Sequence, residues 1–168
     1  QEGIVESSGL ERITARLNAD TQMLDGRVRL GLNLTTALTE DDLVFFENTA
    51  GFQGGLLTNV FDFNPTRPIR TEDGDFFEVG GASVRNPLGI AEEIADDART
   101  TRTLGNAYFE LDIIEGLTGR ISLGGDRSTA RRAIYFPISN PLGEANGNGL
   151  AGQRDLQRTA VNFFGTLN

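Results

Sequence analysis

Acidic side chains are the residues of this sequence best placed to do chemistry, because the chain contains no His and no Cys. Without imidazole or thiolate there is no Ser-His-Asp arrangement, no usual general base and no soft-metal site. Metal binding would depend on carboxylate and carbonyl oxygens, which suit hard cations such as Ca²⁺. The composition therefore argues against an ordinary hydrolase or a transition-metal enzyme.

One group of carboxylates lies at residues 72–75 (Glu-Asp-Gly-Asp), with Glu78 following closely. Their oxygens could contribute to a Ca²⁺ site, although such a cluster is more often a solvated turn between two extended segments. We favour the turn and predict no metal site.

A second pair of carboxylates, Glu110 and Asp112, is separated by two positions. On a strand they share one face, so they could imitate the paired carboxylates of a glycosidase. Ion pairs with arginines such as Arg102 or Arg120 are the more common outcome for such residues. We therefore predict no catalytic residues, no cofactor and no enzymatic activity.

Phenylalanine is concentrated in one long segment, where two roles are open. The rings could stack on sugar faces or pack a partner, but a small core of the segment's own is the more common role. The residues are Phe45, Phe46, Phe52, Phe61 and Phe63. Gly124-Gly125 does not open a helix, so no phosphate cradle is expected there.

The elements that position these residues are predicted to be β-strands, because apolar residues recur at every second position. In residues 26–36 (GRVRLGLNLTT), Val28, Leu30, Leu32 and Leu34 alternate with Arg, Gly and Asn. A period of two indicates a strand with one apolar face and one polar face. The predicted strands cover about 11–19, 27–38, 101–113, 118–131 and 158–167.

The connections between these strands alternate strictly between short and long. Turn signals occur at 20–26 and 114–117, and the intervening segments 39–98 and 133–157 are long. Short helices are predicted within 48–61 and, after Asn86-Pro87, over 88–98.

Charge is unevenly distributed along the chain. There are 15 Arg, no Lys and 24 acidic residues, and 13 of the acids but only three Arg lie in residues 39–98. The net charge of −9 argues against a nucleic-acid partner. An acidic, Lys-free chain is compatible with either a saline habitat or a particular genome composition.

Long strands joined alternately by short turns and long loops are typical of a transmembrane β-barrel. The alternative is a soluble or cell-surface β-rich binding module, such as an adhesin, in which the apolar faces pack against another sheet. We favour the first, because several arginines stand opposite the apolar residues, as in a barrel lumen. The predicted fold is all-β, an antiparallel barrel segment of about five strands with a long, partly helical extracellular loop. Five strands cannot close a barrel, and Gln1 is no initiator, so a fragment of a longer protein is expected.

The stretch 86–137 carries several motifs in a recognisable order. Asn-Pro precedes a short helix, an Arg-x-Leu-Gly-Asn-x-Tyr strand follows, and Gly-Leu leads into a strand with Gly-x-Asp and a terminal aromatic-x-Pro. These are Asn86-Pro87, Arg102 to Tyr108, Gly116-Leu117, Gly124 to Asp126 and Tyr135-Phe136-Pro137. In this order and spacing, roughly residues 10–137 resemble SusC-like TonB-dependent outer-membrane transporters of the RagA/SusC family.

The resemblance implies a middle portion of a 22-stranded barrel in the outer membrane of a Gram-negative cell. Such transporters import nutrients, commonly glycans or peptides, with energy delivered through TonB. A SusD-like surface lipoprotein often covers them, and the parts that contact TonB are absent from this chain. The identity of the substrate is not readable from these motifs.

Overall fold

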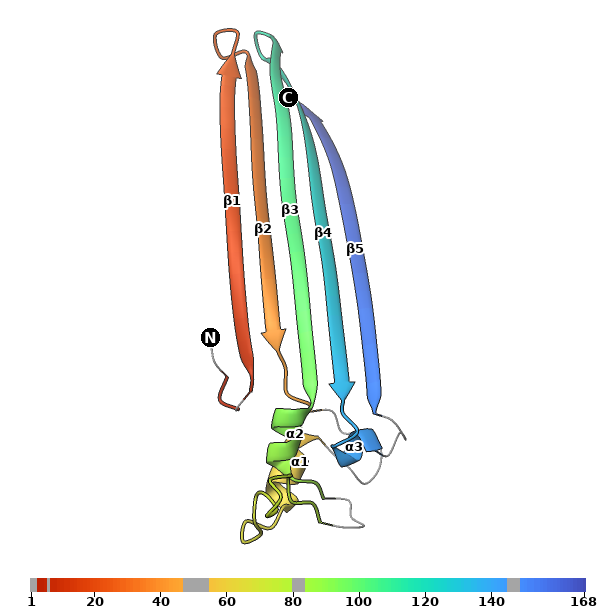
Figure 1. Ribbon diagram of the computed structural model, residues 1–168. Helices are drawn as coiled ribbons and strands as arrows, with labels where there is room; N and C mark the ends of the chain where they lie inside the picture. The colour runs from red at the N-terminus through yellow and green to blue at the C-terminus, as the bar shows by residue number, and fades with distance from the viewer. Residues whose placement is uncertain (1–2, 6, 47–54, 80–83, 145–148) are drawn as a thin grey trace. The chain divides into compact units, whose positions relative to one another are not determined.

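The computed structural model describes residues 3–5, 7–46, 55–79, 84–144 and 149–168. Five long strands form one antiparallel sheet in which neighbours in the chain are neighbours in space (Figure 1). The strands are β1 (Gly9–Met23), β2 (Val28–Asp42), β3 (Ala95–Ile114), β4 (Leu117–Phe136) and β5 (Leu150–Leu167). The predicted number and order of strands are confirmed.

The strands are longer than the sequence pattern predicted. β3 begins at Ala95 rather than near residue 101, and β5 begins at Leu150 rather than near 158. In these added residues both faces carry polar side chains, as in 95–100 (ADDART), so the apolar alternation that marks a strand is missing. The long connections shrink accordingly to 43–94 and 137–149.

Both short connections are tight turns, as predicted. Between β1 and β2, Leu24, Asp25 and Gly26 have φ values of 54°, 53° and 87°, and the Arg27 amide donates to the Leu24 carbonyl at 3.1 Å. This left-handed backbone matches the twist of a hairpin, and Gly26 adopts it without a steric penalty. Glu115 and Gly116 alone separate β3 from β4.

The helices are short and differ in part from the predictions. α1 (Leu56–Asp62) lies largely within the predicted 48–61, of which residues 48–54 fall outside the described ranges. α2 (Pro87–Glu93) starts as predicted but ends five residues before 98, because Ala95 already belongs to β3. α3 (Pro141–Glu144) was not predicted. Within the described ranges, no helix has both the length and the apolar character needed to cross a membrane.

The chain divides into two compact parts. We call residues 12–39, 99–131 and 155–168 the strand unit, and residues 1–11, 40–98 and 132–154 the acidic unit. The strand unit has 10 Arg and 7 acidic residues, a net charge of +3. The acidic unit has 5 Arg and 17 acidic residues, a net charge of −12. The uneven charge of the sequence thus coincides with a structural division.

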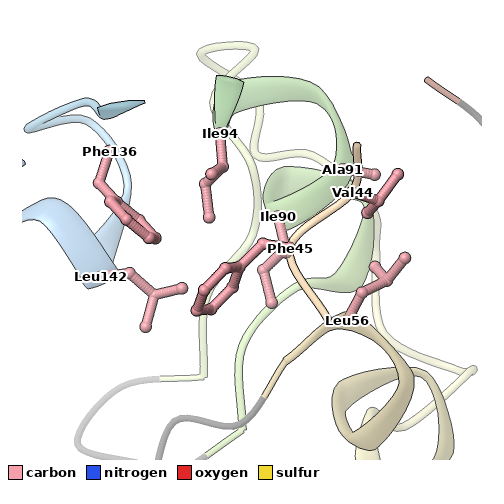
Figure 2. Packing of buried hydrophobic residues seen from close by; sticks show 8 residues of the cluster. All are labelled: Val44, Phe45, Leu56, Ile90, Ala91, Ile94, Phe136 and Leu142. Carbon is pink, nitrogen blue, oxygen red and sulfur yellow. The ribbon is translucent and has the colours of Figure 1, made fainter. Parts of the chain in front are cut away.

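The acidic unit contains a hydrophobic core (Figure 2). Phe45 and Phe136 meet edge to face, with ring centroids 5.1 Å apart, which is a favourable geometry for aromatic pairs. The buried side chains of the core are Val44, Phe45, Leu56, Ile90, Ala91, Ile94, Phe136 and Leu142. This core gathers residues from two connections that are far apart in the sequence.

Three buried asparagines hold the acidic unit together by satisfying backbone groups. Asn86 accepts from the amides of Leu88 and Gly89 as the N-cap of α2, and its Nδ2 donates to two carbonyls. Asn59 accepts from the Arg85 amide at 2.6 Å, and Asn140 accepts from the Leu142 amide at 3.0 Å. Each asparagine is at most 2% exposed, so water cannot reach these backbone groups. The asparagine side chains supply the hydrogen bonds in its place.

Candidate functional site

The sheet of the strand unit has one apolar face. Side chains at alternate positions project there, and Leu34 and Ile113 lie against Gly105 and Gly119 of the neighbouring strands. Val161 and Phe163 are 72% and 70% exposed. The exposed members of this apolar face are Ile13, Leu17, Leu32, Leu34, Phe109, Ile113, Ile121, Leu123, Val161, Phe163 and Leu167. Large apolar side chains of five strands therefore form one face that nothing in the described residues covers.

The opposite face carries a network of ion pairs centred on Arg29. Its Nε donates to Glu110 Oε1 at 2.6 Å, and its Nη2 donates to Asp112 Oδ1 at 3.0 Å. Arg120 approaches the other oxygen of Glu110 at 3.4 Å, and the Thr118 hydroxyl donates to Asp112. The network ties β2, β3 and β4 together across this polar face.

Tyr108 extends the network to the first strand. Its hydroxyl donates to Asp20 Oδ1 at 2.9 Å, and the Arg120 guanidinium lies 4.2 Å from the centre of its ring. The ring crosses directly over Gly31, where a Cβ atom would collide with it. Glycine at position 31 therefore lets the Tyr108 ring reach from β3 over β2 to β1.

The arginine partners of the carboxylates differ in part from the prediction. Arg120 does pair with Glu110, but Arg102 instead forms a two-pronged pair with Asp126, at 3.1 and 2.6 Å. Arg29 is the main partner of both carboxylates, and this pairing was not predicted. It is far from them in sequence, and only the register between β2 and β3 brings it opposite Glu110 and Asp112.

The shared arginine partner argues against a paired-carboxylate active site at Glu110 and Asp112. Glycosidases need one carboxyl that holds a proton and one that does not, which requires two different environments. Here one guanidinium binds both Glu110 and Asp112, so the two carboxylates share a partner and do not have two different environments. The geometry favours a structural role for the pair.

The acidic cluster at 72–75 is a turn, as predicted. Gly74 has a φ of 94°, and Arg70 and Phe76 on either side form an antiparallel bridge. The Arg70 guanidinium lies 4.0 Å from the centre of the Phe76 ring and pairs with Glu92 at 2.9 Å. Among the described residues no three acidic side chains come together in a way that could hold a metal ion.

Glu78 lies apart from this turn. Both of its carboxylate oxygens accept from the Asn86 amide, at 3.2 Å each. Burial raises the pKa of Glu78, while the Asn86 N–H and the charge of Arg85 partly oppose the rise, and Glu93 adds to it. Its carboxylate thus anchors the start of α2 at an electrostatic cost.

The phenylalanines of the long connection differ in how deeply they are buried. Phe45 is in the core, Phe63 is partly buried, and Phe46 and Phe61 are exposed. Phe52 lies outside the described residues, as do 146–148 of the second connection. A small core exists, but of the four described phenylalanines only Phe45 belongs to it, and most of its members are aliphatic. Gly124 and Gly125 lie within β4, away from any helix.

Two curated proteins of Formosa agariphila match most of the chain. TonB-dependent receptor P3 is 26% identical over 150 residues, which are 88% of this chain and 15% of that protein. TonB-dependent receptor P26 is 25% identical over 146 residues, 84% of this chain and 14% of that protein. The chain is distantly similar to TonB-dependent receptors. It spans about one seventh of the length of these relatives. No protein-family model matches it.

Proposed function

We propose that this chain is a wall segment of an outer-membrane TonB-dependent importer of the SusC-like group. In this proposal the apolar face of the strand unit contacts outer-membrane lipid, and the polar face lines the lumen of a β-barrel. The imported nutrient is a glycan or a peptide, and TonB and a SusD-like surface lipoprotein are the protein partners, TonB acting through parts of the receptor outside this chain.

The observation that carries the proposal is the contrast between the two faces of one sheet. Soluble monomers rarely expose a continuous apolar surface of this extent, whereas lipid removes such a surface from water. The opposite face carries ion pairs, such as Arg29 with Glu110 and Arg102 with Asp126, which suits a hydrated lumen.

Two further features support a barrel wall. The strands have 15 to 20 residues, and a tilted strand needs only about 9–11 to cross a bilayer. β1 and β5 form the open edges of the sheet, and in lipid the free backbone groups of an edge must pair with further strands. The distant similarity to TonB-dependent receptors points the same way.

The proposal is tested by labelling neighbouring positions of β2 in the full-length protein in outer-membrane preparations. The chain has no Cys, so Leu32→Cys and Asn33→Cys each introduce one thiol into it. We expect a charged, membrane-impermeant maleimide to label the Asn33→Cys variant and not the Leu32→Cys variant. Leu34→Cys and Thr35→Cys should repeat the alternation one step further along the strand.

After solubilisation in denaturant all four variants should react equally, which controls for expression. Equal labelling of both faces in the native preparation, or recovery of the protein in the soluble fraction, would refute the proposal. Recovery in the soluble fraction would favour the adhesin-like binding module instead.

A further inference from the structure

The apolar face of the strand unit does not extend along the whole length of its strands. On β3 the alternate positions from Gly105 to Ile113 carry no polar side chain, although the strand has 20 residues. That stretch is close to the length of about 9–11 residues that a tilted strand needs to cross a bilayer. On β1 and β2 apolar side chains recur as far as Ile13 and Leu38, as expected where tilted strands cross a level boundary obliquely. β3 therefore continues well beyond the apolar face.

Hydrophilic side chains continue the same side of the sheet toward the long connections. Leu34 of β2 lies against Gly105 of β3. One step further along, the hydroxyls of Thr36 and Thr103 share a hydrogen bond at 3.1 Å. β4 and β5 lie next in the sheet (Figure 1), and their side chains on this side change in the same way. We call this set the polar belt, and its members are Thr36, Thr101, Thr103, Arg127, Thr129, Gln157 and Thr159.

Arg127 lies where the polar belt borders the apolar face on β4. Its neighbour Asp126 binds Arg102 on the polar face, so Arg127 projects from the opposite side of the sheet. On that side it is the first charged residue after the apolar stretch that ends at Gly125. The Arg127 side chain is exposed and, within the described residues, makes no ion pair or hydrogen bond. Such an arginine can lay its aliphatic stem on an apolar surface and hold its charge among lipid headgroups.

We propose that Arg127 and the threonines of the polar belt bind the phosphate headgroup of an anionic membrane lipid whose acyl chains lie on the apolar face. A guanidinium donates two parallel hydrogen bonds to a phosphate, and the hydroxyls of Thr129 and Thr159 offer further donors. The adjoining apolar face adds hydrocarbon contact that an inorganic ion lacks, so the occupant is a lipid. The lipid belongs to the leaflet on the side of the long connections. This inference rests on the proposed function, because it requires the apolar face to contact lipid.

The level of the belt is tested by single Cys substitutions on one side of β4, in the full-length protein in outer-membrane preparations. Leu123→Cys lies in the apolar stretch, and Thr129→Cys lies in the polar belt on the same side of the strand. A charged, membrane-impermeant maleimide should label Thr129→Cys and not Leu123→Cys, and both should react in denaturant. Equal labelling or equal protection of the two native variants would overturn the proposal. If Asn33→Cys is then labelled and Leu32→Cys is not, the wall assignment stands and only the belt fails.

The headgroup is tested by reconstituting the full-length protein into vesicles of phosphatidylcholine and phosphatidylglycerol. After gentle extraction, native mass spectrometry counts the lipids that each variant retains. Arg127→Gln removes the charge of the belt, and Arg16→Gln is the matched control. Arg16 is also exposed and, in the described part of the chain, makes no ion pair or hydrogen bond. It lies on the polar face of β1, as does Asp20, which accepts from the Tyr108 hydroxyl there.

We expect the unmodified protein and Arg16→Gln to retain phosphatidylglycerol in preference to phosphatidylcholine. Arg127→Gln should retain phosphatidylglycerol about fivefold less. Added inorganic phosphate should not displace the lipid, because the ion has no hydrocarbon to place on the apolar face. Equal retention by all three proteins, no preference for phosphatidylglycerol in the unmodified protein, or displacement by inorganic phosphate would overturn the lipid site. The alternating labelling of β2 would remain valid in each of these cases.

Discussion

The acidic unit buries many of its large apolar side chains, whereas the strand unit leaves most of them exposed. Eight apolar residues of the acidic unit pack into a core, with Ile90 fully buried. In the strand unit only Val28 and Ala37 reach comparable burial among the described residues, while the apolar face stays exposed. A comparison of the two shows that an apolar pattern in the sequence need not mark a protein core.

The ion pairs of the two units also differ in burial. The acidic unit buries Asp96 completely, where the Arg132 guanidinium binds both of its carboxylate oxygens at 2.7 and 2.6 Å. In the strand unit the main ion pairs are partly exposed, including Arg29 with Glu110 and Arg102 with Asp126. The acidic unit therefore has the buried core of a small globular domain, whereas the strand unit keeps apolar side chains exposed on one face and ion pairs partly exposed on the other.

The largest expected effect comes from the core of the acidic unit. Phe45→Ala should cost about 3–5 kcal/mol, because it removes a buried ring and leaves a cavity beside Phe136. Hydrogen exchange of the full-length protein should speed up in 40–46 and 84–94 but not in the strand unit. Phe61→Ala is the control, since Phe61 is 84% exposed and should change stability by less than about 0.5 kcal/mol. Equal effects of both substitutions would mean that the core does not stabilise this unit.

The apolar face provides the next largest effect. Leu32→Arg should cost about 2–4 kcal/mol if position 32 lies near the bilayer midplane, because lipid solvates the guanidinium poorly. The amount of heat-modifiable, folded protein in the outer-membrane fraction should fall. Asn33→Arg, one residue further on the polar face, should be tolerated. If Leu32→Arg left this amount unchanged, the apolar face of the strand unit would not be in contact with lipid. The proposed difference between the two units would then fail.

A smaller effect is expected from the polar face. Arg29 and Glu110 are partly exposed, so a double-mutant cycle with Arg29→Gln and Glu110→Gln should give a favourable coupling that is smaller than either effect above. Denaturant unfolding in detergent measures it. The same cycle with Arg27→Gln, whose side chain is exposed, should give a coupling near zero. A coupling near zero in both cycles would show that the network adds no stability.

The smallest effect concerns Glu78 of the acidic unit. Because its pKa is raised above the ordinary value of 4.5, the folded state holds the proton more tightly than the unfolded state. Its contribution to stability is therefore present at low pH and is lost as the pH rises through the window above 4.5. Hydrogen exchange of residues 84–93, corrected for intrinsic rates, should reveal this slope, and Glu78→Gln should flatten it. An unchanged slope would assign the dependence to other carboxyls.

The sequence predicted the sheet better than the acidic unit. Alternation at Val28, Leu30, Leu32 and Leu34 was sufficient to identify β2, and similar runs identified the other four strands. The ends of β3 and β5 were missed because polar residues occupy both faces there. The burial of Asn59 and Asn140 carries no local signal, because the Arg85 amide that Asn59 binds and the Gly89 carbonyl that Asn140 binds become their neighbours only after the chain folds.

Which residues share a face follows from the sequence, because the period of a strand is a local property of the backbone. The sequence also determined that one segment carries most of the negative charge. The tertiary structure alone decided which charges meet: Arg29 binds Glu110 and Asp112, and Arg102 binds Asp126. Register between strands sets these pairs, and it depends on contacts between residues more than twenty positions apart, which no local pattern specifies.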